Sequence, residues 1–121
     1  MLRLAVPVLH VASSMAAEAL YSLLGFKIES TYRPADGHPD PCYLTLSRDN
    51  ARIHLSSFPG DGVPGSVVNL YVTDVDAIHD ELTTAGLTAD LAPTDQSWGT
   101  REVYIADPDG NKLRFVQASA S

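Results

Sequence analysis

An internal repeat constrains the fold of this chain more than any other feature of its sequence. The same residue types recur 61 positions apart, at Leu9 and Leu70, at Val11 and Val72, and at Gly25 and Gly86. This spacing is half of the 121 residues, so each half of the chain holds one copy. A repeat of this length corresponds to one supersecondary unit, which needs a neighbour to bury its apolar side. The sequence therefore predicts two copies of one small unit.

Each copy contains one predicted helix. The first is expected over residues 14–24, where apolar side chains follow helical spacing and Ser13 or Ser14 serves as the N-cap. The second is expected to begin after Asp74, a second residue type that favours N-caps. A glycine follows each helix and ends it by adopting the left-handed conformation.

Strands are predicted on both sides of each helix. They cover residues 5–11, 26–32, 43–47 and 51–56 in the first half and residues 67–72, 88–91, 101–105 and 112–117 in the second. Each half is then a βαβββ unit, over about residues 1–57 and 66–118, and a linker of about residues 58–65 joins the two within one domain. The predicted fold class is α+β, with two four-stranded mixed sheets. One unit alone has too few apolar positions for a core, so the halves should pair, within the chain or across a homodimer, and curve around a shared cavity.

Composition narrows the classes of function. Apolar residues make up 45% and charged residues 19% of the chain, which is typical of a globular protein. Eight basic against fifteen acidic residues give a net charge of -7, which argues against nucleic-acid binding and is compatible with a cationic or neutral small ligand. No segment is long and apolar enough for a membrane span. Cys42 is the sole cysteine, so no intrachain disulfide forms and a cytoplasmic location is the default expectation.

Several motifs carry a resemblance to a known superfamily. They are Leu9-x-Val11, Tyr21-x-x-Leu24-Gly25-Phe26, Trp98-Gly99 and Asp107-Pro108-Asp109-Gly110-Asn111. Together they resemble the vicinal oxygen chelate superfamily, which includes glyoxalase I, extradiol dioxygenases, fosfomycin-resistance enzymes and the bleomycin resistance proteins. The resemblance covers nearly the whole chain. Residues 5–9 and 96–102 are particularly similar to the bleomycin-binding branch.

The resemblance implies four metal-ligand positions, and the sequence shows what occupies each. They are Val6, Val67, His54 and Arg114. Neither valine can bind a metal ion, and the arginine would repel one, so His54 is left as a weak candidate on its own. We therefore expect no catalytic metal and no cofactor, a condition that favours a binding protein over an enzyme. A metal-dependent glyoxalase or dioxygenase type of enzyme stays open if another loop supplies ligands beside His54.

The resemblance also implies that a drug is bound unchanged, in crevices formed across a homodimer. Trp98 offers a flat surface to the bithiazole rings of a bleomycin-type ligand, and Glu102 is a candidate for attracting its cationic tail. Strand parity places four polar candidates on one concave face: His54, Asn69, Tyr71 and Arg114. Tyr104 and Tyr43 could line the same cavity, but the sequence does not decide their faces.

The predicted function is therefore sequestration of bleomycin-type glycopeptide antibiotics by a cytoplasmic homodimer, which would confer resistance. A binder of another aromatic or peptide-like small molecule is the alternative, since Asn69 stands where well-characterised relatives carry a second tryptophan. Two structural alternatives also stay open. Trp98 could cap the core beside Gly99, and His54 could be a hydrogen-bonded interior histidine.

Overall fold

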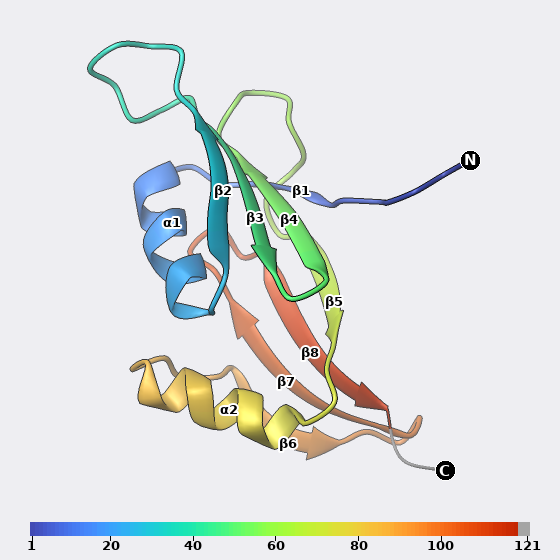
Figure 1. Cartoon of the computed structure of the whole chain (residues 1–121). Helices are drawn as coiled ribbons and strands as arrows, with labels where there is room; N and C mark the ends of the chain where they lie inside the picture. The colour runs from blue at the N-terminus through green and yellow to red at the C-terminus, as the bar shows by residue number, and fades with distance from the viewer. Residues whose placement is uncertain (119–121) are drawn as a thin grey trace. The chain divides into compact units, whose positions relative to one another are not determined.

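The computed structural model describes residues 1–118, and it divides the chain into two compact units, Met1–Ser66 and Val67–Ser121. Each unit contains one helix and four strands in the order βαβββ (Figure 1). The first unit holds β1 (Val8–His10), α1 (Ser14–Leu23), β2 (Lys27–Tyr32), β3 (Tyr43–Arg48) and β4 (Ala51–Ser56). The second holds β5 (Val67–Tyr71), α2 (Val75–Thr84), β6 (Leu91–Asp95), β7 (Thr100–Ala106) and β8 (Lys112–Ala118). The predicted repeat of βαβββ units is confirmed.

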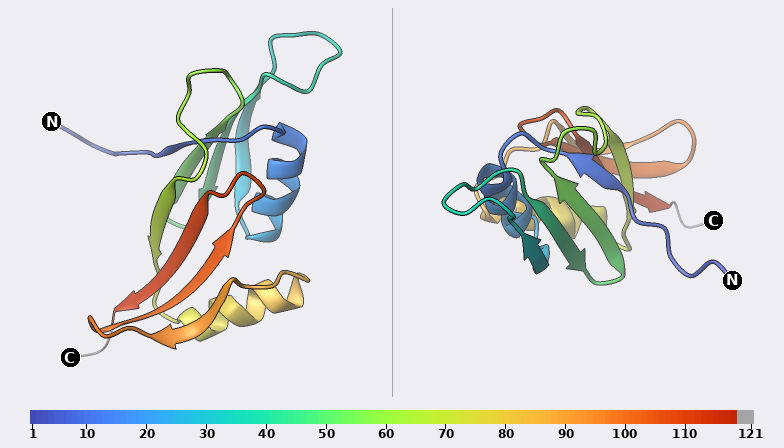
Figure 2. Two further views of the ribbon diagram at one scale, coloured as in Figure 1. Left: turned by 180° about the vertical axis from the view of Figure 1, so that it is seen from behind. Right: turned by 90° about the horizontal axis from the view of Figure 1, so that it is seen from above.

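Both sheets have the same topology. The strand order is β1-β4-β3-β2 in the first unit and β5-β8-β7-β6 in the second. The first strand of each unit runs parallel to the last, and the other pairs are antiparallel, so both sheets are mixed. One helix lies against each sheet (Figure 2). No helix within residues 1–118 has the length and apolar character needed to cross a membrane.

The helix ends follow the repeat. Ser13 and Asp74, which are 61 positions apart, are the two N-caps, and each side chain accepts a hydrogen bond from the backbone N–H three residues later, at 3.2 and 3.0 Å. Gly25 and Gly86 both have a φ of 85°, a conformation that glycine adopts without steric cost. Of the two N-cap candidates in the first half, the structure selects Ser13. Local signals therefore set the bounds of both helices.

Loss of either N-cap should destabilise the protein to a similar degree. We expect Ser13→Ala and Asp74→Ala each to lower the free energy of unfolding by about 1 kcal/mol, because each leaves a helical N–H without its partner. Urea denaturation followed by far-UV circular dichroism measures this change. Ser22→Ala is the matched control, since Ser22 is an exposed serine inside α1, and it should leave stability unchanged or slightly raised. An equal loss in the control would show that the caps contribute nothing specific.

Two predicted strands were placed incorrectly. The strand predicted over residues 88–91 is β6 at Leu91–Asp95 instead. Pro93 has no N–H, and it is tolerated in β6 because β6 is an edge strand whose register shifts between Leu91 and Thr94. The first strand is also shorter than residues 5–11. Pro7 accepts a hydrogen bond from the His54 backbone but cannot donate one, so the ladder begins only at Val8.

Each unit buries its own apolar residues between its helix and its sheet. Tyr21 of α1 is fully buried and meets Phe26 edge to face, with ring centroids 6.2 Å apart. Leu82, its counterpart 61 positions later in α2, is 1% exposed. Cys42 is buried as well and serves as a small core residue. The buried side chains of the strands include Leu44, Leu46, Ile53 and Leu55 in the first sheet and Val103, Ile105, Leu113 and Phe115 in the second.

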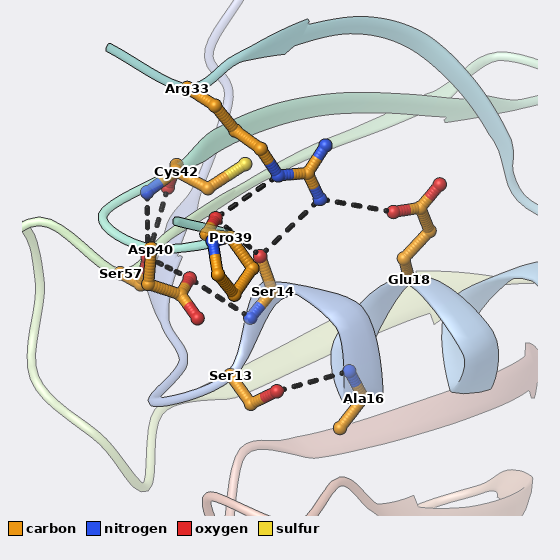
Figure 3. A network of polar contacts seen from close by, with 9 residues as sticks. All are labelled: Ser13, Ser14, Ala16, Glu18, Arg33, Pro39, Asp40, Cys42 and Ser57. Atoms are coloured by element: carbon orange, nitrogen blue, oxygen red, sulfur yellow. Dashed lines mark hydrogen bonds and ion pairs between the residues drawn. The ribbon is translucent and has the colours of Figure 1, made fainter. Parts of the chain in front are cut away.

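A polar network ties the end of the loop at residues 33–42 to the start of α1 (Figure 3). The Asp40 carboxylate accepts hydrogen bonds from the Ser14 backbone N–H at 3.1 Å and from the Ser57 hydroxyl at 2.6 Å. Burial raises the pKa of Asp40, but the bonds from Ser57 and Ser14 outweigh it, and the pKa lies below its ordinary value. Arg33 adds an ion pair with Glu18 of α1 at 3.4 Å. The network provides a hydrogen-bond acceptor for the Ser14 N–H at the start of α1. It also fixes the end of the loop that leads into β3.

Candidate functional site

Three of the predicted site residues form one row across the second sheet. Asn69 of β5 lies opposite Arg114 of β8, and Arg114 lies opposite Tyr104 of β7. Opposite residues on neighbouring strands point to the same face of a sheet. Arg114 Nε donates a 2.8 Å hydrogen bond to Asn69 Oδ1, and its guanidinium carbon lies 5.8 Å from the centroid of the Tyr104 ring. The structure thus decides the face of Tyr104. We call this side of the sheet the Arg114 face.

The next row of the Arg114 face holds two further candidates. Tyr71 of β5 and Glu102 of β7 both lie opposite Val116 of β8. The Tyr71 side chain is 75% exposed, whereas Glu102 is only 4% exposed. Lys112 also belongs to this face, with its Nζ 5.7 Å from the centroid of the Tyr104 ring. The face therefore combines exposed aromatic surface with two cationic side chains and one buried carboxylate.

Glu102 is hydrogen-bonded to three side chains of its own unit. Its Oε2 accepts hydrogen bonds from Trp98 Nε1 at 3.0 Å and from the Thr100 hydroxyl, and its Oε1 accepts one from the Tyr104 hydroxyl at 2.6 Å. Burial raises the pKa of Glu102, but the hydrogen bonds from Thr100, Tyr104 and Trp98 outweigh it and hold the pKa below its ordinary value. The hydrogen bond that the Tyr104 hydroxyl donates to Glu102 raises the pKa of Tyr104. Glu102 is therefore an ionised acceptor for three side chains, and a direct contact with the cationic tail of a ligand stays a prediction.

Trp98 stands in the tight turn between β6 and β7. Gly99 N–H donates to the Gln96 carbonyl at 3.1 Å, and Gln96 N–H donates to the Thr100 carbonyl at 2.7 Å. The φ of Gly99 is 97°, which explains why a glycine follows the tryptophan. The Trp98 side chain is 66% exposed, so it does not cap the core of its unit. Its ring is accessible while its one polar atom is bound to Glu102.

An exposed ion-pair network fixes the β6–β7 hairpin against α2. Arg101 of β7 donates to both carboxylate oxygens of Asp76 at 3.0 Å and to Asp95 at 3.2 Å. The hydrogen bonds from Arg101 lower the pKa of Asp76. Three points of the unit, β7, α2 and the end of β6, are thereby joined beside the turn that carries Trp98.

His54 lies in the first unit. It pairs with Val8 of β1 and with Thr45 of β3, and Val8 is the repeat equivalent of Asn69, which pairs with Arg114. His54 and Arg114 therefore occupy equivalent strand positions. The His54 Nδ1 shares a 2.8 Å hydrogen bond with the Tyr43 hydroxyl, and the two rings meet edge to face at 5.3 Å. Burial raises the pKa of Tyr43, and the charge of Asp61 adds to the effect. His54 is thus half-buried and hydrogen-bonded to Tyr43, and its contact with a ligand stays a prediction.

The residues at the four expected metal positions do not form a metal-binding donor set. Val6 and Val67 supply no donor atom, and Arg114 is a cation engaged with Asn69. His54 is the single donor among the four. Within residues 1–118, no group of three or more His, Cys, Asp or Glu side chains is close enough together to hold a metal ion.

Two contributors to the Arg114 face were missed in the sequence. Thr100 stands two residues before Glu102 on β7, and Lys112 stands two residues before Arg114 on β8. Residues two apart on a strand share a face, so strand parity contained the signal for both. Neither residue stands at a position that the resemblance marks.

Comparison with known proteins agrees with this architecture. The chain matches the family described as "Glyoxalase superfamily protein" over residues 1–121. A crystal structure of a bleomycin-binding protein complexed with bleomycin is similar, with a TM-score of 0.74 and 23% identity over 98% of this chain and 100% of the other. A bleomycin resistance determinant encoded on the transposon Tn5 has a TM-score of 0.77 at the same identity and coverage. A glyoxalase / bleomycin resistance protein from Catenulispora acidiphila has a TM-score of 0.71 and 22% identity over 94% of this chain and 96% of the other. No curated protein sequence matches the chain.

Proposed function

Because the chain belongs to the glyoxalase superfamily, we propose that it binds a bleomycin-type glycopeptide antibiotic without changing it chemically and so confers resistance by sequestration. Two observations support the proposal: the similarity to bleomycin-binding structures, and the lack of metal-binding side chains at three of the four expected metal positions. Two valines and an arginine at these positions leave His54 without partners for Lewis-acid chemistry. Binding alone keeps such a drug away from DNA.

The observation that carries this proposal is the state of Trp98. Trp98 is 66% exposed, yet its Nε1–H is bonded to the buried carboxylate of Glu102 at 3.0 Å. An exposed aromatic plane with a fixed edge is suited to stacking on a flat ring system, such as the bithiazole of bleomycin. Since the ring is already held, little conformational entropy is lost when a ligand stacks on it.

The polar groups of the Arg114 face can fix the orientation of a bound ligand. In one row Arg114 is hydrogen-bonded to Asn69 and lies over the Tyr104 ring, and Tyr71 is exposed in the next row. Ligand sites combine apolar and aromatic contact with a small number of polar groups that fix the orientation of the ligand. This face has both components within one unit.

A titration of metal-free bleomycin tests the proposed function. We expect a saturable heat and a saturable change in Trp98 fluorescence, with about one ligand bound per chain. The reading is direct because Trp98 is the sole tryptophan of the chain. Free N-acetyltryptophanamide corrects for absorption by the drug. Absence of both signals, together with failure to protect plasmid DNA from bleomycin cleavage, would refute sequestration.

We further propose that the protein acts as a homodimer. The first residues of the chain precede β1 and present three exposed apolar side chains, Met1, Leu2 and Leu4. Exposed apolar groups close together are typical of a surface that another molecule covers. Light scattering should give about twice the mass of the 13.0 kDa chain, and dilution to monomers should weaken drug binding. A monomer that binds with full affinity would contradict the homodimer.

One observation favours a different aromatic ligand as the second candidate. The charge of Glu102 is buried among three donors, while Arg114 and Lys112 flank Tyr104 on the same face. This arrangement favours an anionic substituent over a cationic tail. Saturable quenching of Trp98 by a naphthalene carboxylate, absent with the equivalent naphthylmethyl ammonium ion, would support the second candidate if bleomycin itself gives no saturable signal.

A further inference from the structure

Glu102 is the one carboxylate of the second unit on which three side-chain donors converge within the described residues. It is 4% exposed and lies in the middle of β7. Burying a carboxylate is costly unless hydrogen bonds replace its lost water. Trp98, Thr100 and Tyr104 supply these bonds, and two of the three are aromatic residues of the candidate site. The compensation for burial thus comes from the groups expected to meet the ligand.

The chemistry of the three donors explains why an acidic residue stands at this position. The indole Nε1–H can only donate, so it needs an acceptor. An ionised carboxylate offers two acceptor oxygens and no hydrogen, so it accepts from all three groups without conflict. The bonds are charge-assisted and therefore stronger than bonds between neutral groups. Glu102 consequently restrains the edge of the Trp98 ring and the hydroxyl end of Tyr104 at the same time.

The restraint extends along the sheet. The Tyr104 ring bonded to Glu102 lies 5.8 Å from the guanidinium carbon of Arg114, and Arg114 donates to Asn69. The buried carboxylate is therefore one end of a chain of contacts that runs across β7, β8 and β5. A shift of the Tyr104 ring would change the surroundings of Arg114.

We propose that Glu102 is a positioning residue, which holds the indole of Trp98 and the phenol of Tyr104 in the orientation that meets the ligand. This assignment rests on the proposed function, because it takes the Arg114 face as the ligand site. It replaces direct attraction of a cationic group as the role of Glu102. The carboxylate acts before binding, by reducing the freedom of side chains that the ligand would otherwise have to order.

The test begins in the free protein with Glu102→Leu, which removes both acceptor oxygens and keeps the volume. Time-resolved fluorescence anisotropy of Trp98 should decay with the tumbling of the whole protein in the unaltered chain. In Glu102→Leu we expect an added sub-nanosecond component, because the released indole rotates about its side-chain bonds. A folded Glu102→Leu protein, checked by far-UV circular dichroism, whose anisotropy decay equals that of the unaltered protein would overturn the proposal.

Glu102→Gln provides a test by conservative replacement. The amide oxygen of glutamine can accept from Trp98 and Thr100 while its NH2 group donates to the Tyr104 hydroxyl, which can also accept. The slow anisotropy decay should therefore be retained in Glu102→Gln. A fast component as large as that in Glu102→Leu would contradict positioning by hydrogen bonding to the indole.

Thr94→Val is the matched control. Thr94 lies opposite Glu102 on β6, and its hydroxyl donates to the Ala92 carbonyl at 2.7 Å, not to Glu102. The change removes a hydroxyl from the same hairpin and leaves the three bonds of Glu102 in place. We expect the anisotropy decay of the unaltered protein. An equal fast component in Thr94→Val would show that any disturbance of the hairpin frees the indole.

A measurement on the unaltered protein keeps the proposal testable if Glu102→Leu does not fold. Hydrogen exchange of the Trp98 indole N–H, followed by NMR, should be slower than that of free N-acetyltryptophanamide, because the bond to Glu102 protects the proton. Exchange as fast as in the free compound would overturn the proposal.

Ligand binding separates this inference from the proposed function. With metal-free bleomycin as the probe, Glu102→Leu should raise the dissociation constant about three- to tenfold, the cost of ordering side chains that were fixed before. If the unaltered protein binds no bleomycin, the proposed ligand fails while the anisotropy and exchange results still decide the role of Glu102. If bleomycin binds to Glu102→Leu with unchanged affinity, the positioning role is refuted and the proposed function stands.

Discussion

Replacing Trp98 by alanine should weaken the binding of metal-free bleomycin by about thirtyfold or more, which corresponds to about 2 kcal/mol. Large aromatic side chains that are exposed in the free protein and covered in the complex dominate the binding energy of many sites. Trp98 has this character, because the residue is 66% exposed and its Nε1–H is already bonded. Asn69 replaces the second tryptophan of the resembling proteins, so a larger share of the stacking falls on Trp98.

Calorimetry measures the loss of affinity in Trp98→Ala, which no longer has the tryptophan needed for a fluorescence titration. Trp98→Phe keeps a flat ring and loses the bond to Glu102, so its affinity should lie between those of the unaltered protein and Trp98→Ala. Tyr32→Ala is the matched control. It removes an exposed aromatic side chain from the first unit, where Tyr32 stacks on Phe58 at 6.0 Å, and should leave the affinity unchanged. Equal affinities of Trp98→Ala and the unaltered protein would show that the drug does not stack on the indole.

The largest losses of stability should come from two buried positions that the repeat makes equivalent. Tyr21 of α1 is fully buried and Leu82 of α2 is 1% exposed, and they are 61 positions apart. We expect Tyr21→Ala to lower the free energy of unfolding by about 3–5 kcal/mol and Leu82→Ala by about 2–5 kcal/mol, since each leaves a cavity beneath a helix. These losses are a large part of the 5–15 kcal/mol, roughly, by which a domain is stable.

Urea denaturation gives both values. Met15→Ala is the control, because Met15 is 62% exposed on α1 and its truncation should cost less than about 0.5 kcal/mol. Should Tyr21→Ala or Leu82→Ala be no less stable than Met15→Ala, the helix in question does not pack on its sheet as described.

Most of the fold could be predicted because its signals are local. The caps Ser13 and Asp74, the glycines after both helices and the apolar spacing between them act within a few residues of the chain. The repeat supported each helix a second time, because the same signals recur 61 positions apart. The strand predicted at residues 88–91 failed for the opposite reason. Whether Pro93 is tolerated depends on β6 being an edge strand, a property of the assembled sheet.

The candidate site shows the same division. Residue types and strand parity were enough to predict that Asn69 and Arg114 share a face, and the register confirms that they lie opposite each other. They were not enough to assign Tyr104 to one face of the sheet, because the sequence allowed several registers between its strand and the neighbouring strands.

The sequence by itself determined the repeat, the two capped helices, the βαβββ order and the residue types available to the site. The tertiary structure alone decided where β6 runs and which face Tyr104 occupies. Both depend on how neighbouring strands pair, and more than one register can satisfy the same sequence pattern. The three donors to Glu102 are close to it in the chain, since Thr100 and Tyr104 share β7 with it and Trp98 stands four residues before it. That these bonds form with a carboxylate that is only 4% exposed follows from the packing of the assembled unit, which the sequence does not show.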